Sequence, residues 1–165
     1  MKILSLSFAL IGCGLISVAN AASPAAEKPP TSEKLSAKQC QATSEAEIAA
    51  LFERWNDSLK TGEPGKVVAN YAKTSVLLPT VSNKVRLSAE EKADYFTAFL
   101  SNKPVGVIDS RSIMLGCDSA VDAGVYTFTY GTSGKTVQAR YSYSYAWDGA
   151  QWLITSHHSS AMPEG

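Results

Sequence analysis

The sequence has no excess of either charge and few residues of the types that usually carry chemistry. Fifteen lysines and arginines balance fifteen aspartates and glutamates, and only two histidines and three cysteines are present. A chain without a basic patch is not expected to bind nucleic acid or an anionic lipid surface. The G-x-S-x-G nucleophile, the H-E-x-x-H zinc helix and internal repeats are also missing. These absences exclude the hydrolases, zinc peptidases and repeat proteins that those patterns mark.

The N-terminal 21 residues predict export. Lys2 precedes an apolar stretch that ends in Ala19-Asn20-Ala21, the small-residue pattern of a signal-peptidase site. A signal peptide over residues 1–21 would deliver a soluble protein, most naturally to the periplasm, with no membrane association after cleavage. The alternative is a lipoprotein anchored at Cys13, because Leu10-Ile11-Gly12-Cys13 resembles a lipobox.

Residues 22–39 are rich in Ala, Pro, Ser and Lys, and we predict a flexible leader there because the segment has little apolar surface to bury. A single domain would then span 40–165. The mature chain keeps two cysteines, Cys40 and Cys117, and an even pair in an oxidising compartment predicts a disulfide. The alternative is two buried thiols.

The first half of the domain has a helical pattern. Capping boxes at Ser44–Glu47 and Ser88–Glu91 predict two helix starts. The first is followed by an apolar stripe at helical spacing, formed by Ile48, Leu51, Phe52, Trp55 and Leu59. We expect a short second helix over 64–71 and a strand over 75–81. Pro104 ends the third helix.

The second half alternates as strands do. Four segments, 105–117, 120–130, 136–147 and 151–160, are separated by short turn sequences. Helices followed by an antiparallel meander predict an α+β fold, with about three N-terminal helices packed on one face of a curved, mostly antiparallel sheet.

The last two strands carry the candidate site residues. Tyr141, Tyr143, Tyr145 and Trp147 share one face of their strand, which is either the core under the helices or an interface between subunits; Arg140 lies on the other face. On the closing strand Trp152 and Ile154 indicate the inner face, and alternation places His158 with them and His157 opposite. Adjacent histidines on opposite faces do not ligate one ion, so we expect neither a metal nor a cofactor.

Four stretches, "ALFERWNDSLKTGEPGKVVANYA", "SVLLPTVSN", "ADYFTAFL" and "DGAQWLITSHHSSAMPE", resemble the nuclear transport factor 2-like superfamily. Within it the chain is most similar to bacterial relatives of the association domain of calcium/calmodulin-dependent protein kinase II, in a wider circle with SgcJ/EcaC and SnoaL-like proteins. The resemblance covers about residues 40–164 and includes no kinase domain. It implies a cystatin-like α+β cone with a pocket between helices and sheet, and oligomerisation through the outer sheet face.

On this resemblance, the row Tyr141, Tyr143, Tyr145 and Trp147 becomes the interface and Arg140 faces the pocket. The resemblance also makes Trp55, Tyr71 and Tyr95 pocket walls.

Enzymes of the superfamily use an inward aspartate, and none can be placed here, because Asp57 and Asp94 lie on predicted helices. We therefore expect an exported, non-catalytic homodimer or higher oligomer that binds a small polar or anionic ligand through Arg140 and His158. One alternative is an isomerase, dehydratase or cyclase with His158 as acid–base. The other is a purely structural assembly module.

Overall fold

The computed structural model describes residues 40–163, so the predicted signal peptide (1–21) and leader (22–39) lie outside the described residues. The chain folds into the elements α1 (Glu45–Lys60), α2 (Pro64–Val68), β1 (Tyr71–Leu78), α3 (Ala89–Leu100), β2 (Pro104–Leu115), β3 (Ser119–Tyr130), β4 (Thr136–Trp147) and β5 (Trp152–Ala161).

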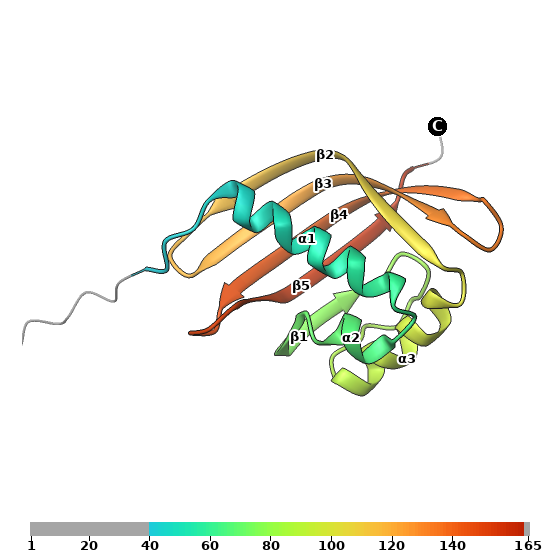
Figure 1. Cartoon of the computed structure of the whole chain (residues 1–165), viewed down its shortest axis with the longest axis horizontal. Coiled ribbons are helices and arrows are strands. Elements are labelled where there is room, and N and C mark those ends of the chain that lie inside the picture. Colours follow the sequence, from blue (N-terminus) through green and yellow to red (C-terminus); the bar gives the residue numbers. More distant parts are fainter. Residues whose placement is uncertain (1–39, 164–165) are drawn as a thin grey trace, which may run out of the picture. The chain divides into compact units, whose positions relative to one another are not determined.

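The five strands form one curved sheet in the order β1-β5-β4-β3-β2. β1 runs parallel to β5, and all the other pairs are antiparallel. Figure 1 shows α1 lying across one face of the sheet, with α2 and α3 beside β1 at one end. The predicted α+β fold is confirmed.

The helix starts form as predicted. Ser44 Oγ accepts from the backbone N–H of Glu47 while the Glu47 carboxylate accepts from the Ser44 N–H, and Ser88 and Glu91 repeat this pairing. α2 ends at Val68, earlier than expected. The Asn70 side-chain amide donates to carbonyls of the last turn of α2, which closes that helix and lets β1 begin at once.

The tyrosine row of β4 lies in the core, so the prediction that it forms a subunit interface is wrong. Tyr141, Tyr143 and Tyr145 are buried beneath α1, and the Phe52 ring of α1 packs against the first two. Trp147 continues the row and packs on a second tryptophan at the sheet end. The apolar stripe of α1 needs a large apolar partner, and this aromatic face of β4 provides it. Successive side chains of a strand point to opposite faces. The β4 residues that alternate with this row, Arg140 among them, therefore point outward.

A β-bulge in β5 reverses the predicted orientation of the two histidines. Tyr145 of β4 pairs with Ile154 while Ser144 pairs with Ser156, which leaves Thr155 as an extra residue. Alternation therefore shifts by one, and His157 is buried with 4% of its surface exposed whereas His158 is exposed. The expectation of an inward His158 is wrong for this reason.

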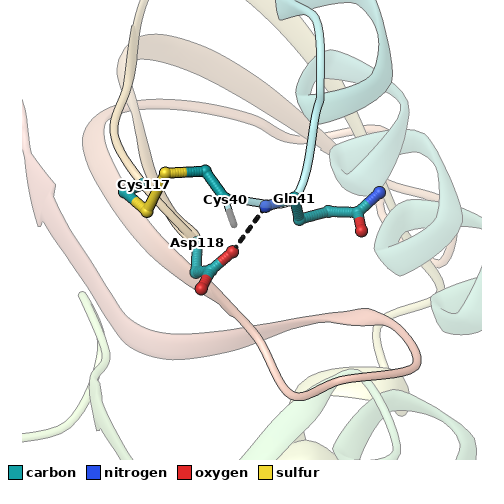
Figure 2. The surroundings of a disulfide bond; sticks show 4 residues. All are labelled: Cys40, Gln41, Cys117 and Asp118. Carbon is teal, nitrogen blue, oxygen red and sulfur yellow. Dashed lines mark hydrogen bonds between the residues drawn. A yellow bond between two sulfur atoms is a disulfide. The ribbon is translucent and has the colours of Figure 1, made fainter. Parts of the chain in front are cut away.

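Cys40 and Cys117 form the predicted disulfide (Figure 2). It ties the segment before α1 to the turn between β2 and β3, and the Gln41 N–H donates to Asp118 Oδ1 at 2.7 Å beside it. None of the helices in residues 40–163 is long and apolar enough to cross a membrane.

Candidate functional site

A small pocket lies between α3 and the inner face of the sheet, at the end where β1 pairs with β5. Its walls are mostly aromatic and its polar atoms are few. The lining residues are Trp55, Leu77, Pro79, Thr80, Val81, Tyr95, Phe96, Phe99, Tyr126, Phe128, Tyr130, Val137, Ala139, His157 and Ser159. The space open to the centre of a water molecule is about 30 Å³, which holds about two waters. Such a pocket suits a ligand of a few atoms.

A chain of hydrogen bonds orients His157 at the pocket wall. Trp55 Nε1, which can only donate, lies 3.2 Å from Tyr71 Oη, and Tyr71 Oη lies 2.8 Å from His157 Nδ1. Tyr71 Oη accepts from the indole, and in the tautomer of His157 that also uses the phenol O–H, Tyr71 donates to Nδ1. A neutral His157 then carries its proton on Nε2, and among the described residues this atom has no hydrogen-bond partner.

The surroundings of His157 keep it neutral. Its ring stacks on Tyr143 with centroids 4.1 Å apart and meets the edge of Trp55 at 5.4 Å. Burial, with a smaller contribution from His158, lowers the pKa of His157 to about 3. At neutral pH the imidazole is therefore a hydrogen-bond donor at Nε2 rather than a base.

Three hydroxyl groups complete the polar side of the pocket. Tyr126 Oη donates to Ser159 Oγ at 2.6 Å, and Ser159 Oγ also hydrogen-bonds Thr80 Oγ1. Burial raises the pKa of Tyr126, so the phenol stays protonated. The sequence analysis missed these groups. Ser159 follows His157 by two residues and shares its face, so once the bulge is known the strand pattern places it in the pocket.

The predicted site residues divide into two groups. Trp55 and Tyr95 line the pocket together with His157. Tyr71 does not line it, but its hydroxyl hydrogen-bonds His157 Nδ1. Arg140 and His158 are exposed and do not line the pocket. Within residues 40–163, no group of three or more His, Cys, Asp or Glu side chains is placed to hold a metal ion.

An inward aspartate is present, although the sequence analysis found none. Asp122 of β3 is fully buried; its Oδ1 accepts from Tyr141 Oη at 2.8 Å and from Arg111 Nε at 3.2 Å. Burial raises the pKa of this carboxyl, against the opposing effects of both partners. The sequence did contain a signal for it: Asp122 is an even number of residues before Tyr126 and Phe128, so the three side chains share one face of the strand.

The family model for the calcium/calmodulin dependent protein kinase II association domain matches residues 44–163. The chain belongs to this family. An association-domain structure from Xanthomonas campestris is 52% identical, with a TM-score of 0.70, and the alignment covers 77% of this chain and 97% of that one. The resemblance predicted from the sequence is confirmed. No curated protein sequence matches the chain.

More distant structures share the fold of this association domain. A nuclear transport factor 2-like protein from Pseudomonas putida KT2440 is 18% identical with a TM-score of 0.65, covering 76% of this chain and 92% of that one. The iota-carbonic anhydrase of a cyanobacterium, solved with bicarbonate, is 17% identical with a TM-score of 0.67, covering 75% of this chain and 95% of that one. At these identities the likeness concerns the fold alone.

Proposed function

We propose that this association-domain protein binds bicarbonate in the pocket beside His157 and catalyses its interconversion with carbon dioxide. The observation that carries the proposal is the buried Nε2–H of His157, which has no partner among the described residues and belongs to a pocket of about 30 Å³. A structural neighbour, the iota-carbonic anhydrase, was solved with bicarbonate, which supports the choice of ligand.

The pocket offers bicarbonate a matched set of hydrogen-bonding groups. His157 Nε2–H donates to one oxygen of the ligand, and the hydroxyls of Ser159 and Thr80 can donate to or accept from the others. The walls formed by Phe96 and Phe128 exclude water and strengthen these hydrogen bonds. The same apolar walls accept the uncharged, linear carbon dioxide.

Hydration in this pocket proceeds by attack of a water molecule on the carbon of carbon dioxide. The water oxygen, held by Ser159 and Thr80, forms the new bond. One C=O electron pair moves onto the oxygen that faces His157 Nε2–H, which stabilises the developing negative charge. The proton lost by the water passes through the pocket mouth to a buffer base in solution, because the lowered pKa of His157 and the raised pKa of Tyr126 make neither a proton acceptor at neutral pH.

The test is stopped-flow measurement of carbon dioxide hydration by the oxidised mature chain. Replacing one preorganised donor costs roughly 10²-fold, so His157→Gln is expected to lower kcat/KM by about that factor and Ser159→Ala by about tenfold. The matched control is His158→Gln, which removes the outer histidine and should leave kcat/KM unchanged. Wild-type protein that hydrates carbon dioxide no faster than buffer would refute the proposal, as would equal losses in the two histidine variants.

Assembly through the outer sheet face remains a proposal, now with different residues. Most outward side chains at the centre of β3 and β4 are small or β-branched, among them Val121, Ala123, Val125 and Ser142, and Arg140 lies opposite Val125. Such a face allows two sheets to approach closely, and association-domain membership supports a second copy as its partner. Val125→Arg should convert oligomers to monomers in light scattering, while Lys135→Glu, in the turn after β3, should not; monomeric wild-type protein would contradict the proposal.

Export also remains a proposal. It is supported by the Cys40–Cys117 disulfide, since such bonds persist mainly in oxidising compartments. Mass spectrometry of the protein from its native host is expected to find Ala22 as the N-terminus. A lipidated Cys13 would favour the anchored alternative, and an intact Met1 would refute export.

A further inference from the structure

A second, larger cavity adjoins the pocket beside His157, and we call it the outer cavity. The space in it that is open to the centres of water molecules is about 450 Å³. Four side chains line both cavities and form the wall between them: Val81, Tyr95, Phe99 and Tyr130. The other lining residues are mostly polar, namely Ser82, Arg86, Asp94, Ala98 and Asn102. A molecule in the outer cavity therefore lies next to the pocket.

Arg86 is held in place at the wall of the outer cavity. Its backbone N–H and C=O exchange 3.0 Å hydrogen bonds with Leu77 of β1. Its Nη1 donates to the backbone carbonyl oxygen of Glu91 at 3.2 Å and to the Asp94 carboxylate. The guanidinium also lies over the Tyr95 ring, with Cζ 5.9 Å from the ring centroid. The position of the guanidinium is thus fixed by the protein itself.

These contacts leave the Nε/Nη2 edge of the Arg86 guanidinium free. Within residues 40–163, Nε is buried without a hydrogen-bond partner, and both side-chain hydrogen bonds of Arg86 come from Nη1. The Nε–H and one Nη2–H of a guanidinium point the same way, which is the fork that donates to both oxygens of a carboxylate-type group. A buried donor without an acceptor destabilises the fold, so an oxyanion on this edge would remove a penalty.

The surroundings of the free edge favour a small, singly charged oxyanion. The Asp94 carboxylate already balances part of the Arg86 charge, which disfavours an anion with two charges. Ser82 Oγ accepts from the Lys84 N–H at 3.2 Å, so its own hydrogen is available to a ligand oxygen. Bicarbonate is a planar monoanion with two carboxylate-type oxygens, and it matches both the charge and the fork.

We propose that the outer cavity is a second anion site, in which the Nε/Nη2 edge of Arg86 binds bicarbonate next to the pocket. The identity of the anion as bicarbonate rests on the proposed function, whereas the anion site does not. Formate presents the same pair of oxygens and is neither formed nor consumed by carbon dioxide hydration, so it serves as the probe. Arg86 acts here as a positioning residue, because the reacting atoms lie beside His157.

The anion site is tested by NMR of the oxidised protein. The side-chain Nε–H resonance of Arg86 is followed while formate is added, with chloride at equal ionic strength as the reference. The expected result is a saturating shift that formate causes and chloride does not. An Arg86 resonance that responds equally to both anions, or to neither, would overturn the inference.

Variants separate the fork from general electrostatic attraction. Arg86→Lys keeps the charge but lacks the fork, and it should weaken formate binding about tenfold, as followed through the backbone amide of Ser82. Asp94→Asn removes the competing carboxylate and should strengthen binding about threefold. The matched control Lys66→Gln removes a positive charge that does not line the cavity and should leave the Kd unchanged. Formate binding as tight in Arg86→Lys as in wild type would refute the site.

Hydration kinetics connect the anion site to the proposed function. Formate in the outer cavity fills the space next to the pocket, so it should inhibit hydration with an inhibition constant equal to its Kd from NMR. Arg86→Lys should raise that constant about tenfold; an unchanged constant would break the connection. His157→Gln should leave the formate shift of Arg86 intact. If wild-type protein does not accelerate hydration, the proposed function fails, and the NMR titration alone decides the anion site.

Discussion

The burial of His157 makes the stability of the fold depend on pH in a predictable direction. In the unfolded chain a histidine has a pKa near 6.5, whereas the folded protein lowers that of His157 to about 3. Between these values the unfolded state binds a proton that the folded state does not. Stability is therefore lost as pH falls below 6.5, and the loss continues until the folded state is protonated near pH 3.

The size of this effect follows from the separation of the two pKa values. Each pH unit below 6.5 costs about 1.4 kcal/mol, so the stability contribution of His157 should fall by about 2 kcal/mol between pH 7 and pH 5. That window lies above the usual range of aspartate and glutamate titration. Burial raises the pKa of Asp122, but this carboxyl is present in every variant compared, so its contribution cancels in the difference between them.

Urea unfolding of wild type, His157→Gln and His158→Gln at both pH values measures this contribution. Wild type and His158→Gln should lose about 2 kcal/mol more than His157→Gln on going from pH 7 to pH 5. Only the pH difference enters, so a general destabilisation by the core substitution cancels. The histidine ring resonances give a second measurement, in which His157 should not titrate between pH 5 and 8. Equal pH dependence in the two variants, or a His157 that titrates near 6.5, would refute the buried placement.

Reduction of the disulfide formed by Cys40 opens a loop of 77 residues and should lower the free energy of unfolding by about 4 kcal/mol on a chain-entropy basis. Urea titration with and without reductant measures this difference, and a change below about 1 kcal/mol would contradict the expectation. Gly124→Ala would bring a Cβ within 1.9 Å of a β2 carbonyl oxygen and should cost at least about 2 kcal/mol, whereas Gly65→Ala, with open space around it, should be neutral or slightly stabilising in the same thermal melts. Asn56→Ala removes a pair of 2.9 Å hydrogen bonds to the backbone of Gly106 and should cost about 2–4 kcal/mol; a loss under 1 kcal/mol would show that solvent replaces them.

Local signals in the sequence predicted most of the fold. Ser44 and Ser88 start helices because a capping box is decided by residues three apart, and the stripe containing Phe52 and Trp55 faces the core because helical spacing puts it on one side. The pairing of Cys40 with Cys117 was predicted from the number of cysteines and the expected export, and the disulfide is present.

The site could not be predicted in the same way, because it depends on which face of a strand is inner. Alternation grouped Tyr143 correctly with its neighbours, but it gave two faces without saying which one α1 covers. Asp122 was hidden by the same ambiguity in β3. The two adjacent histidines were assigned in reverse, since a bulge at Thr155 has no signature in the residue types around it.

The extra residue in β5 has a consequence for how the site tolerates insertions and deletions. The strand ends in doubled letters, His157-His158 followed by Ser159-Ser160. If Thr155 were deleted and the strand paired without its bulge, His157 and Ser159 would keep their places opposite Tyr143 and Tyr141. If the bulge persisted with Ser156 as the extra residue, His158 and Ser160 would take those places. In both cases the pocket would receive an imidazole and a hydroxyl. The doublets thus place a second imidazole and a second hydroxyl on the outer face of β5, each one residue after its counterpart in the pocket.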